Sequence, residues 1–410
     1  MREILASIDI GSYKIKLVVG EILHDELKVL CALDEDSRGI KKGAICDSDE
    51  VVFAVKKLLN KCEELLGIKI TKVLVTINED SLDFKTGESI VALGDEGEVT
   101  TQDVVRSING TFKNKIANGM DLVCAIPIMY KVDDRKTRSP KGMKGTHLSC
   151  KSVVITAPKR DIDDAIKTMS KCGLEVIDVI PPSIGSFYAF KQPSHEMETG
   201  VIIDIGYETT NIGIINKGIL INNLVLGLGG KNIDNDLSFV YKISKKDAQK
   251  IKNEFALANK RSASKKEIEE FTTTVGDKIE ISQADASEVC MSRVREILNM
   301  AKNEINYLTK KEISYIIITG GLSEFRDFSL EVESVFGNIA TIGNLNIIGA
   351  RDNKYACSIG MIKYFDENMN LRDKEFSILS QDEIDRLSGK DDLKDPKDES
   401  IIGKVFGMFK

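Results

Sequence analysis

Two short segments of this chain repeat one pattern and lie about half the chain apart. The first reads Ile-Asp-Ile-Gly-Ser over residues 8–12, and the second reads Ile-Asp-Ile-Gly-Tyr over residues 203–207. Each is a β-branched run that ends in Asp-Ile-Gly, turns through a short polar loop and returns as a second apolar run, which is the pattern of a β-hairpin. The repeat predicts an α/β protein of two related halves, each opening with such a hairpin.

The two hairpin loops carry groups that suit the phosphates of a nucleotide. Glycine lets backbone N–H groups approach anionic oxygens closely, and hydroxyl groups add further donors. Asp9 and Asp204, at the strand ends, suit a Mg²⁺ ion held through its water shell. An ordinary hairpin explains either loop by itself, but the pair favours a phosphate site. The loop residues are Gly11, Ser12 and Lys14 in the first half and Gly206, Thr209 and Thr210 in the second.

Two glycine pairs follow in the second half. Gly229 and Gly230 precede the expected start of a helix at Asn232, and a helix N-terminus favours anions. The apolar run 314–319 ends at Gly320 and Gly321, where a base or phosphate can lie against the backbone. Each pair alone is a weak signal, because many α/β strands end in glycine.

Composition excludes several classes of protein. The chain has 410 residues, a net charge of −7 and no Trp, so neither a basic stripe for duplexes nor a stacking platform for single strands is expected. None of the eight cysteines forms a C-x-x-C pair, which predicts reduced thiols, with a zinc site as the alternative. Nothing at the N-terminus looks like a signal peptide, and no run reaches the roughly 18 apolar residues that a spanning helix needs. We therefore expect a soluble protein, or one that attaches to a membrane without crossing it.

Changes in residue composition along the chain divide it into expected segments. An apolar stripe predicts a helix over 49–66, and a β-branched run predicts a strand over 70–77. Thr, Pro and Gly then mark a first insertion, and charged helices mark a second. The expected segments are 1–83 with 163–196 as subdomain 1A, 84–162 as inserted subdomain 1C, 197–230 with 311–365 as subdomain 2A, 231–310 as subdomain 2B, 366–399 as a flexible charged linker, and 400–410 as an amphipathic tail.

The tail predicts contact with a membrane surface. Residues 366–399 hold twelve acidic and six basic residues, which is typical of a linker without a core. The tail then becomes apolar with flanking lysines, so as a helix it suits the headgroup layer of an anionic membrane. Packing on the body or on a partner is the alternative. The membrane residues are Ile401, Ile402, Lys404, Val405, Phe406, Met408, Phe409 and Lys410.

The order of these motifs resembles the actin, Hsp70 and sugar-kinase superfamily. Within it, the stretch 139–148, Ser-Pro-Lys-Gly-Met-Lys-Gly-Thr-His-Leu, is similar to the FtsA family of bacterial cell-division proteins, as are 125–134, 229–237 and 355–360. The resemblance implies an actin-like ATPase fold with an FtsA-type subdomain in the first half and ATP with Mg in the cleft. By motif, it adds Gly229, Gly230, Asn232, Lys252, Gly320, Gly321 and Leu322 to the cofactor-binding residues.

The resemblance also implies a function. The protein would polymerise on the cytoplasmic side of the cell membrane at the division septum, tether FtsZ filaments there and recruit other division proteins. The FtsZ C-terminal peptide would dock on 231–310, where Arg293 and Arg295 begin an amphipathic helix. A PilM-like component of a pilus or secretion assembly and a small-molecule kinase of the same superfamily are the alternatives.

Three departures from the family pattern bear on catalysis. Tyr207 and Glu208 stand where relatives have a glycine pair, and a carboxylate there repels phosphates. Asn211 stands where relatives often have Asp. Pro181-Pro182-Ser183 replaces the connection that positions water in actin and Hsp70, so we expect slow or absent ATP hydrolysis and assign no catalytic residue.

Overall fold

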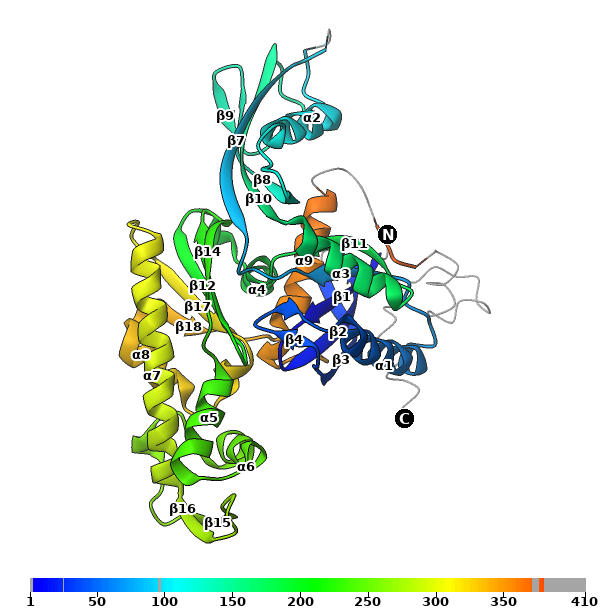
Figure 1. The fold of residues 1–410 in the computed structure, drawn as a ribbon. Helices are drawn as coiled ribbons and strands as arrows, with labels where there is room; N and C mark the ends of the chain where they lie inside the picture. The colour runs from blue at the N-terminus through cyan, green and yellow to red at the C-terminus, as the bar shows by residue number, and fades with distance from the viewer. Residues whose placement is uncertain (1–2, 25, 95–96, 371–375, 380–410) are drawn as a thin grey trace.

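Two five-stranded sheets with one shared topology form the body of the protein. The structure is a computed structural model, and it describes residues 3–24, 26–94, 97–370 and 376–379. In each sheet the first three strands are antiparallel, and two later strands run parallel to the first (Figure 1). The predicted α/β protein of two related halves is therefore confirmed.

The strand order is equivalent in the two halves. The first sheet runs β11-β6-β1-β2-β3 and the second runs β14-β13-β12-β17-β18. Their bounds are β1 (Glu3–Ile10), β2 (Lys14–Leu23), β3 (Glu26–Asp36), β6 (Lys72–Thr76) and β11 (Glu175–Ile180), then β12 (Thr199–Ile205), β13 (Thr210–Asn216), β14 (Ile219–Leu226), β17 (Tyr315–Thr319) and β18 (Ala340–Ile342).

Helices cover the outer faces and fill the space between the sheets. On the first half, α1 (Ser48–Leu66) begins at the capping side chain of Asp47 and buries the predicted apolar stripe. α3 (Lys159–Lys171) lies beside it, and a small hairpin of β4 (Ile40–Lys41) and β5 (Ala44–Ile45) precedes α1. Between the sheets, α4 (Pro182–Phe190) contacts β12 and β13, and α9 (Ala356–Asn370) contacts β1 and β2 (Figure 1).

The first insertion is a separate small sheet that extends away from the two five-stranded sheets (Figure 1). It has a core of its own around Tyr130 and Leu148. However, Ile155 at the base of β10 and Ile162 in α3 belong to the core of the first half, so the predicted boundary at residue 162 lies too far along the chain. Its elements are β7 (Asp83–Ala92), α2 (Thr101–Phe112), β8 (Met120–Val132), β9 (Arg135–Thr137) and β10 (His147–Pro158).

The second insertion projects from the second half as helices with a small hairpin (Figure 1). Its apolar side chains join the core of the second sheet, because Ile233 and Val294 cluster with Val201 and Ile203. Its elements are α5 (Gly230–Tyr241), α6 (Lys245–Lys250), a π-helical turn (Ile251–Phe255), β15 (Ile268–Thr272), β16 (Lys278–Ser282) and α7 (Gln283–Leu308); α8 (Phe328–Phe336) follows β17.

The chain remains ordered beyond the predicted start of the linker at residue 366. α9 continues to Asn370, and Ile378 and Leu379 are buried, with the Ile378 N–H donating to the Ile4 carbonyl at 2.8 Å. The linker prediction therefore begins too early. The predicted tail, 400–410, lies outside the described residues. Within the ranges that the structure describes, no helix is both long and apolar enough to cross a bilayer.

Candidate functional site

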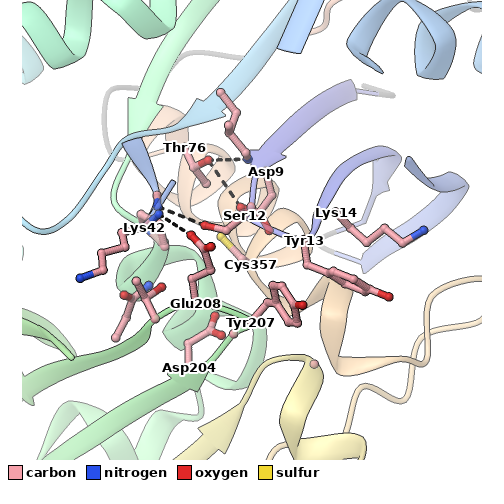
Figure 2. Close-up of a pocket in the computed structure, with 18 of the residues that line it drawn as sticks. Asp9, Ser12, Tyr13, Lys14, Lys42, Thr76, Asp204, Tyr207, Glu208 and Cys357 are labelled. Carbon is pink, nitrogen blue, oxygen red and sulfur yellow. Dashed lines mark hydrogen bonds between the residues drawn. The ribbon is translucent and has the colours of Figure 1, made fainter. Parts of the chain in front are cut away.

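A cleft of about 880 Å³ opens between the two halves, and both Asp-Ile-Gly hairpins line it (Figure 2). The structure brings most of the predicted cofactor residues to its wall. Those that line it are Asp9, Gly11, Ser12, Lys14, Asp204, Gly206, Thr209, Gly230, Lys252, Gly321 and Leu322.

The remaining four predicted residues support the wall from behind. Thr210 donates its hydroxyl to the Leu228 carbonyl at 2.8 Å, and the Asn232 side chain accepts from the Gly229 N–H at 3.0 Å. Gly320 adopts φ +91°, and a Cβ there would lie 2.4 Å from Asp204 Oδ1. Only glycine satisfies both conditions at residue 320.

Asp9 is paired with a lysine that the sequence analysis missed. β1 and β2 place Asp9 opposite Lys16, whose Nζ lies 2.7 Å from Asp9 Oδ2. Burial alone would lower the pKa of Lys16, but the Asp9 carboxylate raises it above the ordinary value. The lysine is therefore a fixed cation at the base of the cleft. The expected hairpin register would have identified it, because directly opposed residues of an antiparallel pair face each other.

Lys14, the predicted cation of the first loop, is paired with two carboxylates of β3. Its ammonium group lies 3.1 Å from Asp34 and 2.7 Å from Asp36, both on β3. Figure 2 shows its side chain extending away from Asp9 and Asp204. Lys14 thus borders the cleft without facing the carboxylates, and Lys16 takes the place that was predicted for it.

Asp204 holds the equivalent position in the second half. Its Oδ2 accepts from the Ser186 hydroxyl at 2.7 Å, and burial raises its pKa above the ordinary value. Asn211 lies opposite it in the hairpin, where Lys16 lies opposite Asp9 in the first half. Among the described residues, no group of three or more His, Cys, Asp or Glu side chains could hold a metal ion, and all eight cysteines are free thiols.

Glu79 is a second residue that the sequence did not indicate. It follows β6, lines the cleft and is only 3% exposed. Its carboxylate accepts from the backbone N–H and the hydroxyl of Ser183, both at 2.7 Å, at the start of α4. Burial raises the pKa of Glu79 to about 7, and the nearby Asp204 charge adds to this. Its partner Ser183 lies more than a hundred residues further along the chain, so no local pattern marks Glu79.

The two side chains that depart from the family pattern bridge the cleft. The Tyr207 ring lies 4.7 Å from the ring of Tyr13 on the first loop, and its hydroxyl accepts from Gln249 at 2.9 Å. Glu208 accepts from the backbone N–H of Lys42 at 2.7 Å and contacts the Lys231 ammonium group at 2.5 Å. Two donors thus hold the Glu208 carboxylate in place.

Lys252 and Arg326 organise the far side of the cleft. Lys252 lies in the π-helical turn, with its ammonium group 2.6 Å from Asp234 and 3.3 Å from the Gly230 carbonyl. The Arg326 guanidinium donates to three carbonyls of the same turn, from Glu254 to Ala256. Such turns are frequent at functional sites.

The predicted partner residues on α7 are both engaged within the chain. Arg293 donates to both carboxylate oxygens of Asp236, at 2.6 and 2.9 Å. Arg295 donates to the fully buried Glu331 at 2.5 Å. A bidentate pair and a buried pair hold these side chains in place, so a docking peptide would have to compete with them.

Known families match this chain in two separate segments. The model described as cell division protein FtsA matches residues 201–360, and the model described as the SHS2 domain inserted in FtsA matches residues 80–156. Cell division protein FtsA of Bacillus subtilis (strain 168) is 28% identical over 388 residues, covering 93% of this chain and 88% of the relative.

Solved structures share the fold at low identity. A PilM-PilN type IV pilus biogenesis complex matches with a TM-score of 0.59 at 13% identity, covering 87% of this chain and 97% of the other. MreB5 of Spiroplasma citri bound to ADP matches with a TM-score of 0.54 at 13% identity, covering 90% and 97%. These likenesses show an actin-like fold.

Proposed function

We propose that this chain, which belongs to the FtsA family of cell-division proteins, binds ATP with Mg²⁺ between its halves and anchors FtsZ filaments to the cell membrane. The observation that carries the nucleotide part is the pair of equivalent hairpins that face one cleft. The solved MreB5 of the same fold carries ADP.

The donor set of the cleft suits a nucleotide. Gly11, Gly206 and Gly230 line the wall beside the hydroxyl-bearing Ser12 and Thr209. The N–H groups of Gly206 and Gly230 donate to the Thr209 and Gly206 carbonyls, so the hydroxyls and the remaining backbone N–H groups are the donors for a phosphate. Phosphate oxygens need such donors, and the N-terminus of α5 at Gly230 adds a favourable dipole. Gly321 and Leu322 also line the cleft, and the base would lie against them.

Asp9 and Asp204 are the residues that would hold Mg²⁺ through water. Both carboxylates line the cleft from strand ends, and hydrated Mg²⁺ needs few protein ligands. When bound, the ion would neutralise phosphate charge. Lys16 already pairs with Asp9, so the ion would share this carboxylate with an ammonium group.

Slow hydrolysis remains our expectation. Ser183 stands in the connection that positions water in related folds, but its hydroxyl donates to Glu79. Glu79 is itself held by Ser183 through both oxygens, so neither side chain is free to turn toward a phosphate without breaking this contact. A turnover well above about one per second would contradict this expectation.

Polymerisation, FtsZ binding and membrane attachment at the cytoplasmic side of the septum complete the proposal. Their support is membership of the FtsA family and the apolar, lysine-flanked sequence 400–410. Ten residues give modest membrane affinity, so stable attachment needs several tails on one polymer.

Two measurements test the proposal. The first is binding of a fluorescent ATP analogue with and without Mg²⁺, where we expect saturable binding that unlabelled ATP reverses. The second is sedimentation with anionic liposomes, comparing the full chain with a version that ends at Lys397. Pelleting of the full chain alone supports the tail as a membrane device. If both versions stay in solution with ATP present, the membrane part is wrong.

The pilus-assembly alternative rests on fold alone. The PilM-PilN complex is 13% identical to this chain, whereas the inserted segment at residues 80–156 matches the FtsA insertion specifically. A kinase would need a catalytic carboxylate facing a substrate, and Glu79 and Asp204 are both held by α4 serines. ADP release that depends on a small-molecule substrate would favour the kinase.

A further inference from the structure

We propose that the Lys42 backbone N–H and the Lys231 ammonium group form a subsite for the terminal phosphate of a nucleoside triphosphate, which Glu208 fills until that phosphate displaces it. This inference rests on the proposed nucleotide binding. It makes Glu208 the residue that sets the preference between nucleoside triphosphate and diphosphate.

The contacts of Glu208 are those of a bound anion. One carboxylate oxygen accepts from Lys42 N–H at 2.7 Å, and the other lies 2.5 Å from Lys231 Nζ. The Glu208 side chain is 12% exposed. Burial alone would raise the pKa of Glu208, but the hydrogen bonds from Lys231 and Lys42 lower it below the ordinary value.

The two donors come from opposite halves of the molecule. Lys42 lies in the turn between β4 and β5 of the first half, and Lys231 lies in the first turn of α5 in the second half. The same carboxylate therefore links the halves across the cleft, as Figure 2 shows for Lys42 and Glu208. A group that replaces the Glu208 carboxylate must accept from both donors, or this link between the two halves is lost.

The position of this pair relates it to the phosphate loops. Glu208 belongs to the second loop, and Gly43, next to Lys42, donates its N–H to Ser12 Oγ of the first loop at 3.1 Å. Phosphate and carboxylate accept from the same donors, and lysine and helix N-termini bind both. The subsite thus lies where the two loops meet, which is where the end of a phosphate chain would arrive.

The free-energy cost of displacing Glu208 from the subsite depends on the number of phosphates in the nucleotide. A terminal phosphate that enters the subsite meets the Glu208 charge, and like charges in a partly buried site repel strongly. A diphosphate that stops short of the subsite leaves Glu208 in place. A purely structural link between the halves would instead affect both nucleotides alike.

The test is the affinity for ATP and for ADP, each with Mg²⁺, of the full chain and its variants. We expect Glu208→Gln to tighten ATP binding about tenfold and ADP binding less than about threefold, because only the charge near the terminal phosphate changes. Lys231→Gln added to Glu208→Gln should remove the gain. Glu64→Gln, an equal change of charge on the exposed face of α1, is the control.

Hydrogen exchange of the 40–45 segment supplies a second readout. Glu208→Ala removes the acceptor of the Lys42 N–H, so it should speed amide exchange there, and ATP should restore protection. If Glu208→Gln tightens ATP and ADP binding equally, or if the amide exchange rate of 40–45 does not change in Glu208→Ala, this assignment is wrong. Neither result would contradict the proposed nucleotide site. Failure of every variant to bind either nucleotide would overturn the proposed function together with it.

Discussion

At the scale of single residues, the cleft contains one carboxyl group that titrates near neutral pH. Burial raises the pKa of Glu79 from 4.5 to about 7. The folded chain therefore binds a proton that the unfolded chain has released between these two values. The free energy of unfolding should fall as pH rises from 4.5 to about 7. Above pH 7 the whole destabilising effect of the buried Glu79 carboxylate is present.

Glu79→Gln should remove this penalty. At pH 8 we expect the variant to be more stable than the unchanged chain by roughly 3 kcal/mol, since one pKa unit corresponds to about 1.4 kcal/mol. At pH 4 the two should differ little, because Gln can still accept from the Ser183 N–H. Denaturant titration at both pH values checks this. A stability difference that does not change with pH would show that Glu79 is ionised in the folded chain across the range.

Lys14 and Lys16 form a matched pair for a second prediction. Lys16 holds the nearly buried Asp9, whereas Lys14 holds two carboxylates at a more exposed edge. Lys16→Met should lower the free energy of unfolding by roughly 3 kcal/mol, since breaking a buried pair leaves an unpaired charge. Lys14→Met should lower it by less than about 1 kcal/mol. The denaturant midpoints of both variants check this prediction. Equal losses of unfolding free energy would contradict the assignment of Lys16 as the buried partner of Asp9.

At the scale of elements, the crossing of α4 and α9 joins the two halves. A Cβ on Gly360 would lie 1.7 Å from the Gly185 carbonyl oxygen, so the two helix backbones are in direct contact. This contact lies between the two sheets, each of which packs on one of the helices. The crossing is therefore a closely packed contact between the two halves.

Gly360→Ala should force the helices apart. We expect a loss of stability of roughly 1–3 kcal/mol or more, the usual cost of overpacking a core. Gly94→Ala is the control, because nothing lies within 4 Å of its Cβ position. Thermal unfolding of the two variants checks this. A melting temperature for Gly360→Ala that equals that of the control would mean that the helices separate without cost.

Local sequence patterns predicted helices and strands, but they did not predict which side chains of distant elements come into contact. The hairpins and α1 follow from alternation and an apolar stripe, and both are confirmed. Lys14 was assigned to the phosphates because its partners Asp34 and Asp36 come from β3, whose register no local signal gives. Glu79 was missed for the same reason, since Ser183 is more than a hundred residues away. The order of 376–379 depends on β1, at the opposite end of the chain.

At the scale of the whole molecule, the two insertions relate differently to the cores. The second insertion shares its core with the second sheet. The first has a core of its own and joins the first half through Val123 and Val153 near the bases of its strands and through a contact of Arg138 with Glu196. Figure 1 shows the first insertion extending away from the two five-stranded sheets, and of the residues described, none in its strands or its helix contributes to the lining of the cleft. The nucleotide site should therefore not depend on the first insertion.

Excision of residues 86–152 tests this independence. Lys85 lies opposite Val154 in the ladder of β7 and β10, so a short glycine turn can close the gap and keep Ile155 in the core of the first half, with Val123 of β8 the buried residue that this core loses. We expect the shortened chain to fold and to bind ATP within about threefold of the full chain, because each domain with its own core folds as a unit. Circular dichroism and fluorescent-nucleotide titration check both points. A folded chain that has lost nucleotide binding would show that the insertion positions the cleft, and an unfolded one would show that the first half depends on the insertion for its core.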